Sequence, residues 1–162
     1  MNISEDGLAF IRDAEGFRGH TYKDVAGYAT IGYGNLKYAT AGRRCTREEA
    51  EQWLLEDLAP KVLTLNKYYG SCGLNQNMFD ALCSLTFNVG AALVTRNGDP
   101  LSNAIHAREW DRAAQAFTHY AKYRKAPGEP LQEHPGLMAR RKKEAALFLR
   151  PIVPKVETSD GR

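Results

Sequence analysis

Residues 15–35 read EGFRGHTYKDVAGYATIGYGN, and this stretch decides the fold prediction for the whole chain. Glu15 is the last residue of a helical pattern over 5–15, which a glycine ends directly afterwards. Glycines then alternate with tyrosines and threonines over 17–38, which predicts a small antiparallel sheet. A second acid, Asp24, and Thr30 lie within that region. The stretch therefore predicts a helix end and a β-hairpin that each carry one carboxylate.

The two carboxylates stand in different local environments. Glu15 would face the negative end of its helix dipole, and Phe10 and Phe17 are placed to shield it from water, so both effects favour the neutral acid. Asp24 follows Lys23 in a polar turn, which favours the ionised form. A proton donor and an ionised partner held apart across a cleft are what glycoside hydrolysis requires. The spacing alone leaves open that Glu15 is a surface acid and that Asp24 only forms the turn.

Three blocks of the sequence are similar, in the same order, to the phage-type lysozymes of glycoside hydrolase family 24. The first block contains Glu15, Asp24 and Thr30. The other two lie at 76–90 and 136–144 and resemble the central buried helix and the C-terminal block of that family. Together the three blocks cover nearly the whole chain.

The resemblance implies a mainly helical α+β fold of two lobes, with a small antiparallel sheet in one lobe and a long helix joining it to the other. We expect one catalytic domain over 1–150. Its β-containing lobe would span about 13–60, and its helical lobe about 61–150 together with the N-terminal helix. Residues 151–162 are expected to form an extended tail.

The resemblance also implies an activity, which is hydrolysis of the β-1,4 bond between N-acetylmuramic acid and N-acetylglucosamine in peptidoglycan, with inversion. Glu15 would be the general acid, Asp24 would activate water, and Thr30 would help to hold that water. Arg140 aligns with an arginine that pairs with the catalytic glutamate, and such a pair opposes the effects that keep Glu15 neutral. No metal or organic cofactor is implied. The residues that match the sugar groove are Gly34, Leu36 and Phe87.

Two other functions remain as alternatives. A lytic transglycosylase acts on the same glycan with a single acid and gives 1,6-anhydro products. A non-catalytic glycan-binding tail protein would keep the fold and lose one of the acids. Both acids are present in this chain, at Glu15 and Asp24, so hydrolysis is the favoured interpretation.

Length and charge limit the other classes of function. The chain has 162 residues, 43% of them apolar and 25% charged, which is typical of one globular domain. A formal charge of +3 is too small to indicate nucleic-acid binding. Basic residues gather near the C-terminus, and they form either a solvated helix face or a surface attracted to the anionic wall. These are Arg140, Arg141, Lys142, Lys143 and Arg150.

The three cysteines predict neither a zinc site nor a disulfide framework, because their number is odd and no Cys-x-x-Cys occurs. Cys83 lies in an apolar helical run and is expected in the core, whereas Cys72 is expected to be an exposed thiol. A Cys–His nucleophile pair is a further alternative without local support. Its candidate histidines are His20, His106, His119 and His134.

The N-terminal residues 1–8 carry acids where a signal peptide needs positive charge, and no segment has membrane-spanning length. We therefore expect no signal peptide, no signal-anchor and no stable membrane insertion. The protein would be held in the host cytoplasm until a holin, as the resemblance implies, gives access to the wall. The expected partner is the peptidoglycan glycan strand, and a monomer is the default.

The rest of the chain is expected to be helical. A capping box at Thr46 and Glu49 begins a long helix, with a kink or a break at Pro60. Asn75 caps a mostly apolar helix to about residue 88, in which Asp80 is either solvent-facing or a buried partner. The remaining predicted elements are a first helix capped by Asp6, short helices at 91–95, 100–107 and 109–119, a loop at 121–136 and a final helix at 137–149.

Overall fold

The computed structural model describes residues 1–24, 27–123 and 129–152. The parts of the predicted hairpin, loop and tail that fall at 25–26, 124–128 and 153–162 lie outside the described residues. The helices are α1 (Glu5–Glu15), α2 (Arg47–Tyr69), α3 (Gln76–Val89), α4 (Ala91–Val94), α5 (Pro100–His106), α6 (Trp110–Ala116), the 3-10 helix η1 (Phe117–Tyr120) and α7 (Pro135–Phe148). The strands are β1 (Arg18–Lys23), β2 (Ala29–Gly32), β3 (Lys122–Tyr123) and β4 (Gln132–Glu133).

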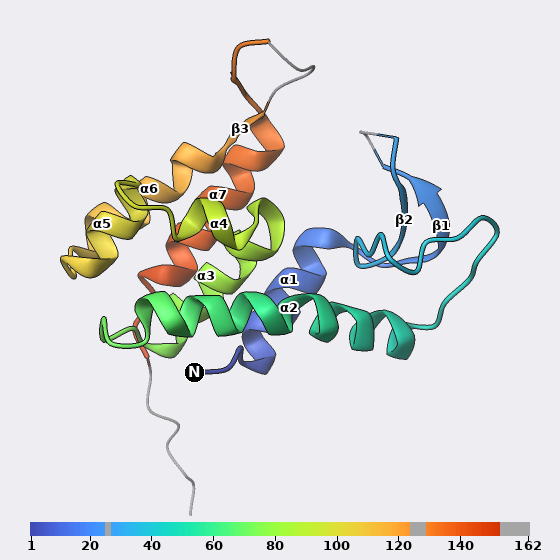
Figure 1. The fold of residues 1–162 in the computed structure, drawn as a ribbon, viewed down its shortest axis with the longest axis horizontal. Coiled ribbons are helices and arrows are strands. Elements are labelled where there is room, and N and C mark those ends of the chain that lie inside the picture. Colours follow the sequence, from blue (N-terminus) through green and yellow to red (C-terminus); the bar gives the residue numbers. More distant parts are fainter. Residues whose placement is uncertain (25–26, 124–128, 153–162) are drawn as a thin grey trace, which may run out of the picture.

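The long helix α2 runs along the molecule and joins its two parts (Figure 1). The antiparallel β1–β2 hairpin lies at one end of α2, and α3 to α7 gather around the other end. The predicted mainly helical α+β fold with a small antiparallel sheet is confirmed.

The first helix begins at a different cap from the predicted one. Ser4, not Asp6, is the N-cap of α1, and its hydroxyl accepts a hydrogen bond from the backbone N–H of Gly7. An N-cap needs an extended backbone, which Ser4 has with φ −82° and ψ 167°, whereas Asp6 already lies in the first helical turn. The helix ends after Glu15 as predicted, with Gly16 at φ 70°.

The hairpin packs directly onto α2. Strands β1 and β2 pair with Tyr22 opposite Thr30, and the register is irregular between Arg18 and Tyr22. Gly32 at the end of β2 has φ 66°, and a Cβ atom there would lie 2.9 Å from the Cβ of Ala50. Glycine at this position therefore allows the close approach of the hairpin to α2.

Helix α2 starts at the predicted capping box, with Thr46 and Glu49 each bonding to the backbone of the other. It then continues through Pro60 to Tyr69, so the predicted alternative of a break into two helices is wrong. Leu58 and Leu65, on either side of the proline, are almost completely buried. Tertiary packing of both halves accounts for a helix that the proline alone would interrupt.

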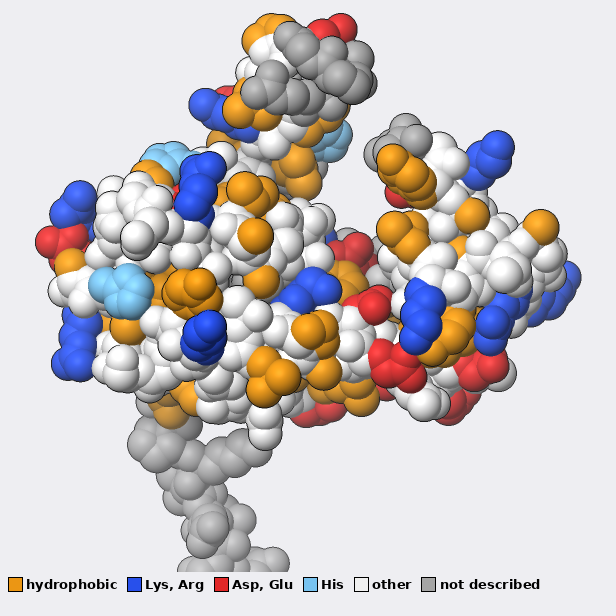
Figure 2. Space-filling view, in the orientation of Figure 1, with side chains coloured by type: hydrophobic (Ala, Val, Ile, Leu, Met, Phe, Trp, Pro, Cys, Tyr) orange, Lys and Arg blue, Asp and Glu red, His pale blue; other side chains and the backbone are white. Residues whose placement is uncertain are grey.

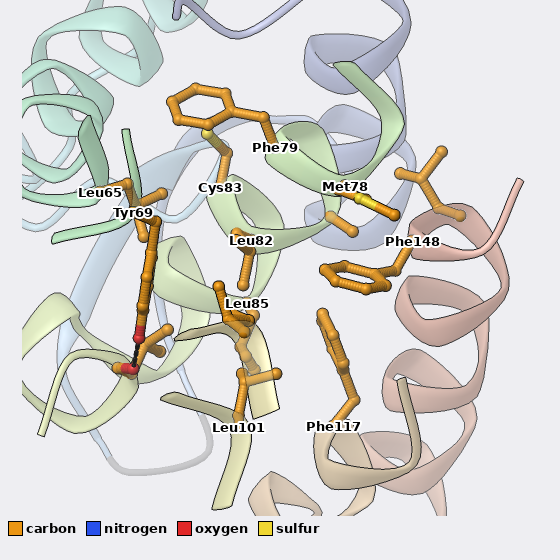
Figure 3. Close-up of a cluster of buried hydrophobic side chains, with 14 of the residues drawn as sticks. Leu65, Tyr69, Met78, Phe79, Leu82, Cys83, Leu85, Leu101, Phe117 and Phe148 are labelled. Atoms are coloured by element: carbon orange, nitrogen blue, oxygen red, sulfur yellow. Dashed lines mark hydrogen bonds between the residues drawn. The ribbon is translucent and has the colours of Figure 1, made fainter. Parts of the chain in front are cut away.

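Helix α3 is the centre of the core, as its apolar pattern predicted. Asn75 caps it, and α1, α2, α4 and α7 all pack against it. Figure 3 shows Leu82 and Leu85 of α3 among side chains from α2, α5, η1 and α7. One hydrogen bond and one aromatic contact lie within this core. The Tyr69 hydroxyl donates to the carbonyl oxygen of Val94, and the ring centres of Phe117 and Phe148 lie 5.5 Å apart.

Asp80 is the buried partner that the sequence left as one of two possibilities. Its side chain on α3 is 1% exposed. Its carboxylate accepts hydrogen bonds from the backbone N–H and the hydroxyl of Ser4 and from the side-chain amide of Gln76. The residue thus attaches the start of α1 to the central helix.

The C-terminal helix begins two residues earlier than predicted. His134 is the N-cap of α7, and its Nδ1 atom accepts from the backbone N–H groups of Gly136 and Leu137 at 3.1 and 3.2 Å. Pro135 fits the first helical turn, where its missing N–H is not needed. Strands β3 and β4 pair within what was predicted as a plain loop.

The contact between α1 and Asp80 predicts an unusual effect of adding a methyl group at Gly7. Gly→Ala in a helix normally stabilises by about 1 kcal/mol. Here the new Cβ would lie 2.6 Å from the Cγ atom of Asp80, so Gly7→Ala is expected to lower the free energy of unfolding by about 1–3 kcal/mol. Urea denaturation measures the change. With Asp80→Ala added, the total loss should be smaller than the sum of the single losses, and a stabilised Gly7→Ala protein would contradict the packing described.

Candidate active site

A groove of about 570 Å³ lies between the β1–β2 hairpin and the helices. The space-filling view shows a hollow between these two parts, with acidic and basic side chains around it (Figure 2). Residues from four parts of the chain line the groove: the end of α1, the hairpin with the segment after it, α2 and the end of α3. They are Glu15, Tyr22, Asp24, Gly34, Leu36, Lys37, Asp57, Lys61, Phe87 and Asn88.

Glu15 is the last residue of α1, and it lines the groove. Its side chain is 19% exposed, so it is neither a free surface acid nor fully buried. Gly34 stands beside it with φ 91°, and a Cβ atom at Gly34 would lie 3.6 Å from Oε2 of Glu15. A glycine here brings the backbone after β2 close to the carboxylate without strain.

Arg140 of α7 holds the other oxygen of Glu15. Its Nη1 atom donates to Oε1 of Glu15 at 2.7 Å, and the arginine side chain is 12% exposed. The ion pair that the resemblance implied is therefore present between residues 125 positions apart. A charge-assisted hydrogen bond in such a sheltered place fixes the direction of the carboxyl group.

Behind Arg140 lies a charged cluster that sequence reasoning did not assign to the site. Glu144 and Arg141 are fully buried on α7, and Ser84 of α3 faces them. Burial raises the pKa of Glu144, although Arg141 opposes that shift, and burial lowers the pKa of Arg141, although Glu144 opposes it. The available signals in the sequence were the spacings of Glu144 from Arg140 (i,i+4) and from Arg141 (i,i+3).

Asp24 faces the same groove from the opposite part of the molecule. It follows β1, and its Oδ1 atom accepts from the backbone N–H of Tyr28 at 2.8 Å. The backbone N–H of Asp24 donates in turn to the carbonyl oxygen of Tyr28 at 2.9 Å. The hairpin thus fixes both the backbone and the carboxylate of this residue, and Glu15 and Asp24 share one groove.

Thr30 lies beneath the groove surface. Its side chain is almost buried, it pairs with Tyr22 across the hairpin, and its hydroxyl donates to the carbonyl oxygen of Tyr28 at 3.0 Å. Among the described residues it is not part of the groove lining. Its contact with Tyr28 joins it to the residue that binds Asp24.

The predicted sugar-groove residues Gly34, Leu36 and Phe87 all line the groove. The sequence did not identify the charged residues beside them. Lys61 donates to the backbone oxygen of Asp57 at 2.7 Å and lies 5.6 Å from the centre of the Phe87 ring. The contact with Phe87 needs α2 and α3 side by side, which no local pattern shows.

Comparison with known proteins places the chain in a family. The sequence matches the family described as phage lysozyme over residues 12–144. The chain belongs to the phage lysozyme family.

Individual members of the phage lysozyme family resemble it along nearly their whole length. An endolysin of Acyrthosiphon pisum secondary endosymbiont phage 1 is 38% identical over 91% of this chain and 98% of its own. The endolysin of Salmonella phage P22 is 32% identical over 92% and 99%. A solved endolysin from Escherichia coli O157:H7 phage FAHEc1 has a TM-score of 0.86 and 33% identity over 96% of this chain and 98% of its own.

The fold places one of the suggested Cys–His pairs in contact. Sγ of Cys72 lies 3.5 Å from Nδ1 of His106. The prediction that Cys72 is exposed is wrong: it belongs to the core, touches His106 at the end of α5 and is 5% exposed. Burial raises the pKa of the Cys72 thiol, partly offset by Arg108, which disfavours the thiolate that a nucleophile needs.

Two further features concern metals and membranes. Across residues 1–24, 27–123 and 129–152, no three His, Cys, Asp or Glu side chains are grouped so as to hold a metal ion. Within the same ranges, every helix is too short or too polar to cross a bilayer.

The burial of the cysteines predicts an order of thiol reactivity. Cys45 is half-buried, whereas Cys72 and Cys83 are buried, and burial raises the pKa of all three thiols. In the native protein an aromatic disulfide reagent should therefore label Cys45 first, and all three should react together in denaturant. Absorbance during labelling, followed by mass mapping, gives the order. Labelling of Cys72 as fast as Cys45 would contradict the described packing.

Proposed function

We propose that this protein is a peptidoglycan-lytic endolysin that hydrolyses the β-1,4 bond between N-acetylmuramic acid and N-acetylglucosamine and so lyses the host cell. One observation carries the proposal: Glu15 and Asp24, from different parts of the fold, face one groove. Membership of the phage lysozyme family supports the substrate class. A groove that is open at the surface can admit a long glycan strand, whereas the sites that bind small molecules usually enclose most of the ligand.

In the proposed mechanism the two carboxyl groups have separate tasks. Glu15 donates its proton to the glycosidic oxygen as the bond to the sugar carbon breaks. Asp24 accepts a proton from a water molecule, whose oxygen bonds to that carbon on the opposite face, so the configuration inverts. An inverting pair needs a separation of roughly 6.5–9.5 Å to admit the water.

Other residues would support these two. We assign Thr30 to the water site, where its bond to Tyr28 also steadies the residue that binds Asp24. Gly34, Leu36 and Phe87 would contact sugar rings along the groove. Arg140 would orient the proton donor through its contact with Glu15. None of these steps calls for a metal or an organic cofactor.

The route to the substrate is part of the proposal. We propose that a monomer is held in the host cytoplasm, reaches the wall through a holin-dependent opening, and acts there as one catalytic domain over 1–150. Glycan strands are its partner. The basic residues of α7 that face solvent would favour approach to an anionic wall.

Replacing the proton donor tests the mechanism. Glu15→Gln keeps an oxygen that can accept from Arg140, so circular dichroism and melting temperature should stay near those of the wild type. Turnover of purified peptidoglycan should fall by about 10²–10⁴-fold, the usual contribution of a general acid. Asp13→Asn, an exposed acid on the same helix, is the matched control and should remain active. Near-normal turnover in Glu15→Gln would exclude the assignment.

Replacing the second carboxylate, Asp24, distinguishes hydrolysis from the lytic transglycosylase alternative. Asp24→Asn should lose about 10²-fold or more of the activity, because water is no longer activated. Mass spectrometry of the released muropeptides should show hydrated products, and early NMR spectra should show the α-anomer. Retained activity with 1,6-anhydro products would favour a lytic transglycosylase, and early β-anomer would exclude inversion.

A further inference from the structure

Glu144 is a fully buried carboxylate directly behind the groove. Its Oε1 atom accepts from the hydroxyl of Ser84 at 2.7 Å, from Nε of Arg140 at 3.1 Å and from Nη2 of Arg141 at 3.0 Å. Its Oε2 atom lies 2.7 Å from Nε of Arg141. The carboxylate is thus shared between two arginines and one hydroxyl of the central helix.

Stability alone gives a weak reason for this cluster. Removing charges from water costs several kcal/mol per ion, and replacing a buried ion pair with apolar side chains of similar volume is often neutral or stabilising. Helices α3 and α7 also pack through apolar side chains, and Leu147 and Phe148 of α7 belong to the core. A charged cluster here therefore calls for a second role.

Arg140 is the member of the cluster that reaches the groove. Its guanidinium is held on three sides: Nη1 donates to Glu15, Nε donates to Glu144, and Nη2 lies 3.4 Å from both the carbonyl oxygen and the hydroxyl of Ser84. Because the guanidinium is planar and rigid, fixing Nε and Nη2 also fixes the direction of Nη1.

We propose that Glu144 is a positioning residue for the reaction: it holds Arg140 in the one orientation that directs Glu15, and it balances the arginine charge. The inference rests on the proposed function, in which Glu15 is the proton donor. Without the Glu144 charge, the full positive charge of Arg140 would act on Glu15 and favour its ionised form, which cannot donate a proton. Ser84 completes the arrangement from α3.

Other charges face Glu15 and stay constant in the test. In the groove they come from β1, from the segment after β2 and from α2, and they are Asp24, Lys37, Asp57 and Lys61. On α1 itself the neighbours are Arg12 and Asp13. Removal of the Glu144 charge changes none of these groups, so a shift in the pH dependence would report on the link through Arg140.

The test measures kcat and KM of the full-length protein on purified peptidoglycan across pH. Glu144→Gln is expected to lower kcat by about 10–100-fold with little change in KM, because the proton donor is misplaced while the groove is intact. The alkaline limb of the kcat profile should move to lower pH by about 0.5–1 unit. Asp80→Asn, another buried carboxylate of the core, is the stability control, and it should keep the wild-type limb.

A second variant covers the case in which two uncompensated arginines prevent Glu144→Gln from folding. Glu144→Met with Arg141→Met removes both buried charges, keeps side chains of similar volume and leaves Arg140 without its Nε partner. We expect this folded double variant to show the same loss of kcat, whereas its alkaline limb should move less, because a positive charge that acts on Glu15 is removed together with Glu144. A double variant with wild-type kcat would overturn the proposal. Failure of both variants to fold, together with a wild-type profile in Ser84→Ala, would also overturn it.

These experiments distinguish a failure of the proposed role of Glu144 from a failure of the proposed function. An inactive wild type, or full activity in Glu15→Gln, would remove the proposed function. Loss of activity in Glu15→Gln together with a wild-type profile in the Glu144 variants would leave that function standing and remove only the role of Glu144.

Discussion

The ion pair between Glu15 and Arg140 is the interaction on which the candidate site depends. It joins the end of α1 to the middle of α7, helices from opposite ends of the chain that both pack on α3. A carboxylate at a helix end would otherwise turn to water, since nothing within α1 holds it. The pair directs it toward the groove, and the whole helical part of the fold serves to bring these two helices together.

The opposite wall of the groove depends on local structure instead. Asp24 is held by hydrogen bonds to Tyr28 within one hairpin, and that hairpin is seated on α2 where Gly32 meets Ala50. One carboxylate is thus fixed by long-range contacts and the other by short-range ones. The fold keeps them on separate supports facing one groove, which matches a reaction that needs a proton donor and an ionised group apart from one another.

The sequence predicted the features that arise within one element. The end of α1 at Gly16, the capping box of α2 and the mostly apolar α3 depend on neighbouring residues, and the structure has them. Several features that need a distant partner were missed, although the resemblance did imply the ion pair of Glu15 and Arg140. Ser4 caps α1 and also binds Asp80 of α3. Helix α2 continues through Pro60 because both of its halves are packed against the core. Cys72 is buried where it contacts His106 of α5. The cluster of Ser84, Arg141 and Glu144 requires α3 against α7, so spacing on α7 alone could show only half of it.

The most direct test of the account is a crystal structure of Glu15→Gln bound to an oligosaccharide of alternating N-acetylglucosamine and N-acetylmuramic acid. We predict that a bridging glycosidic oxygen lies about 2.6–3.2 Å from the side chain at position 15, with Arg140 still in contact and Asp24 across the sugar ring beside a water molecule. A glycan bound elsewhere on the protein, or one whose bridging oxygens all lie far from position 15, would contradict the account.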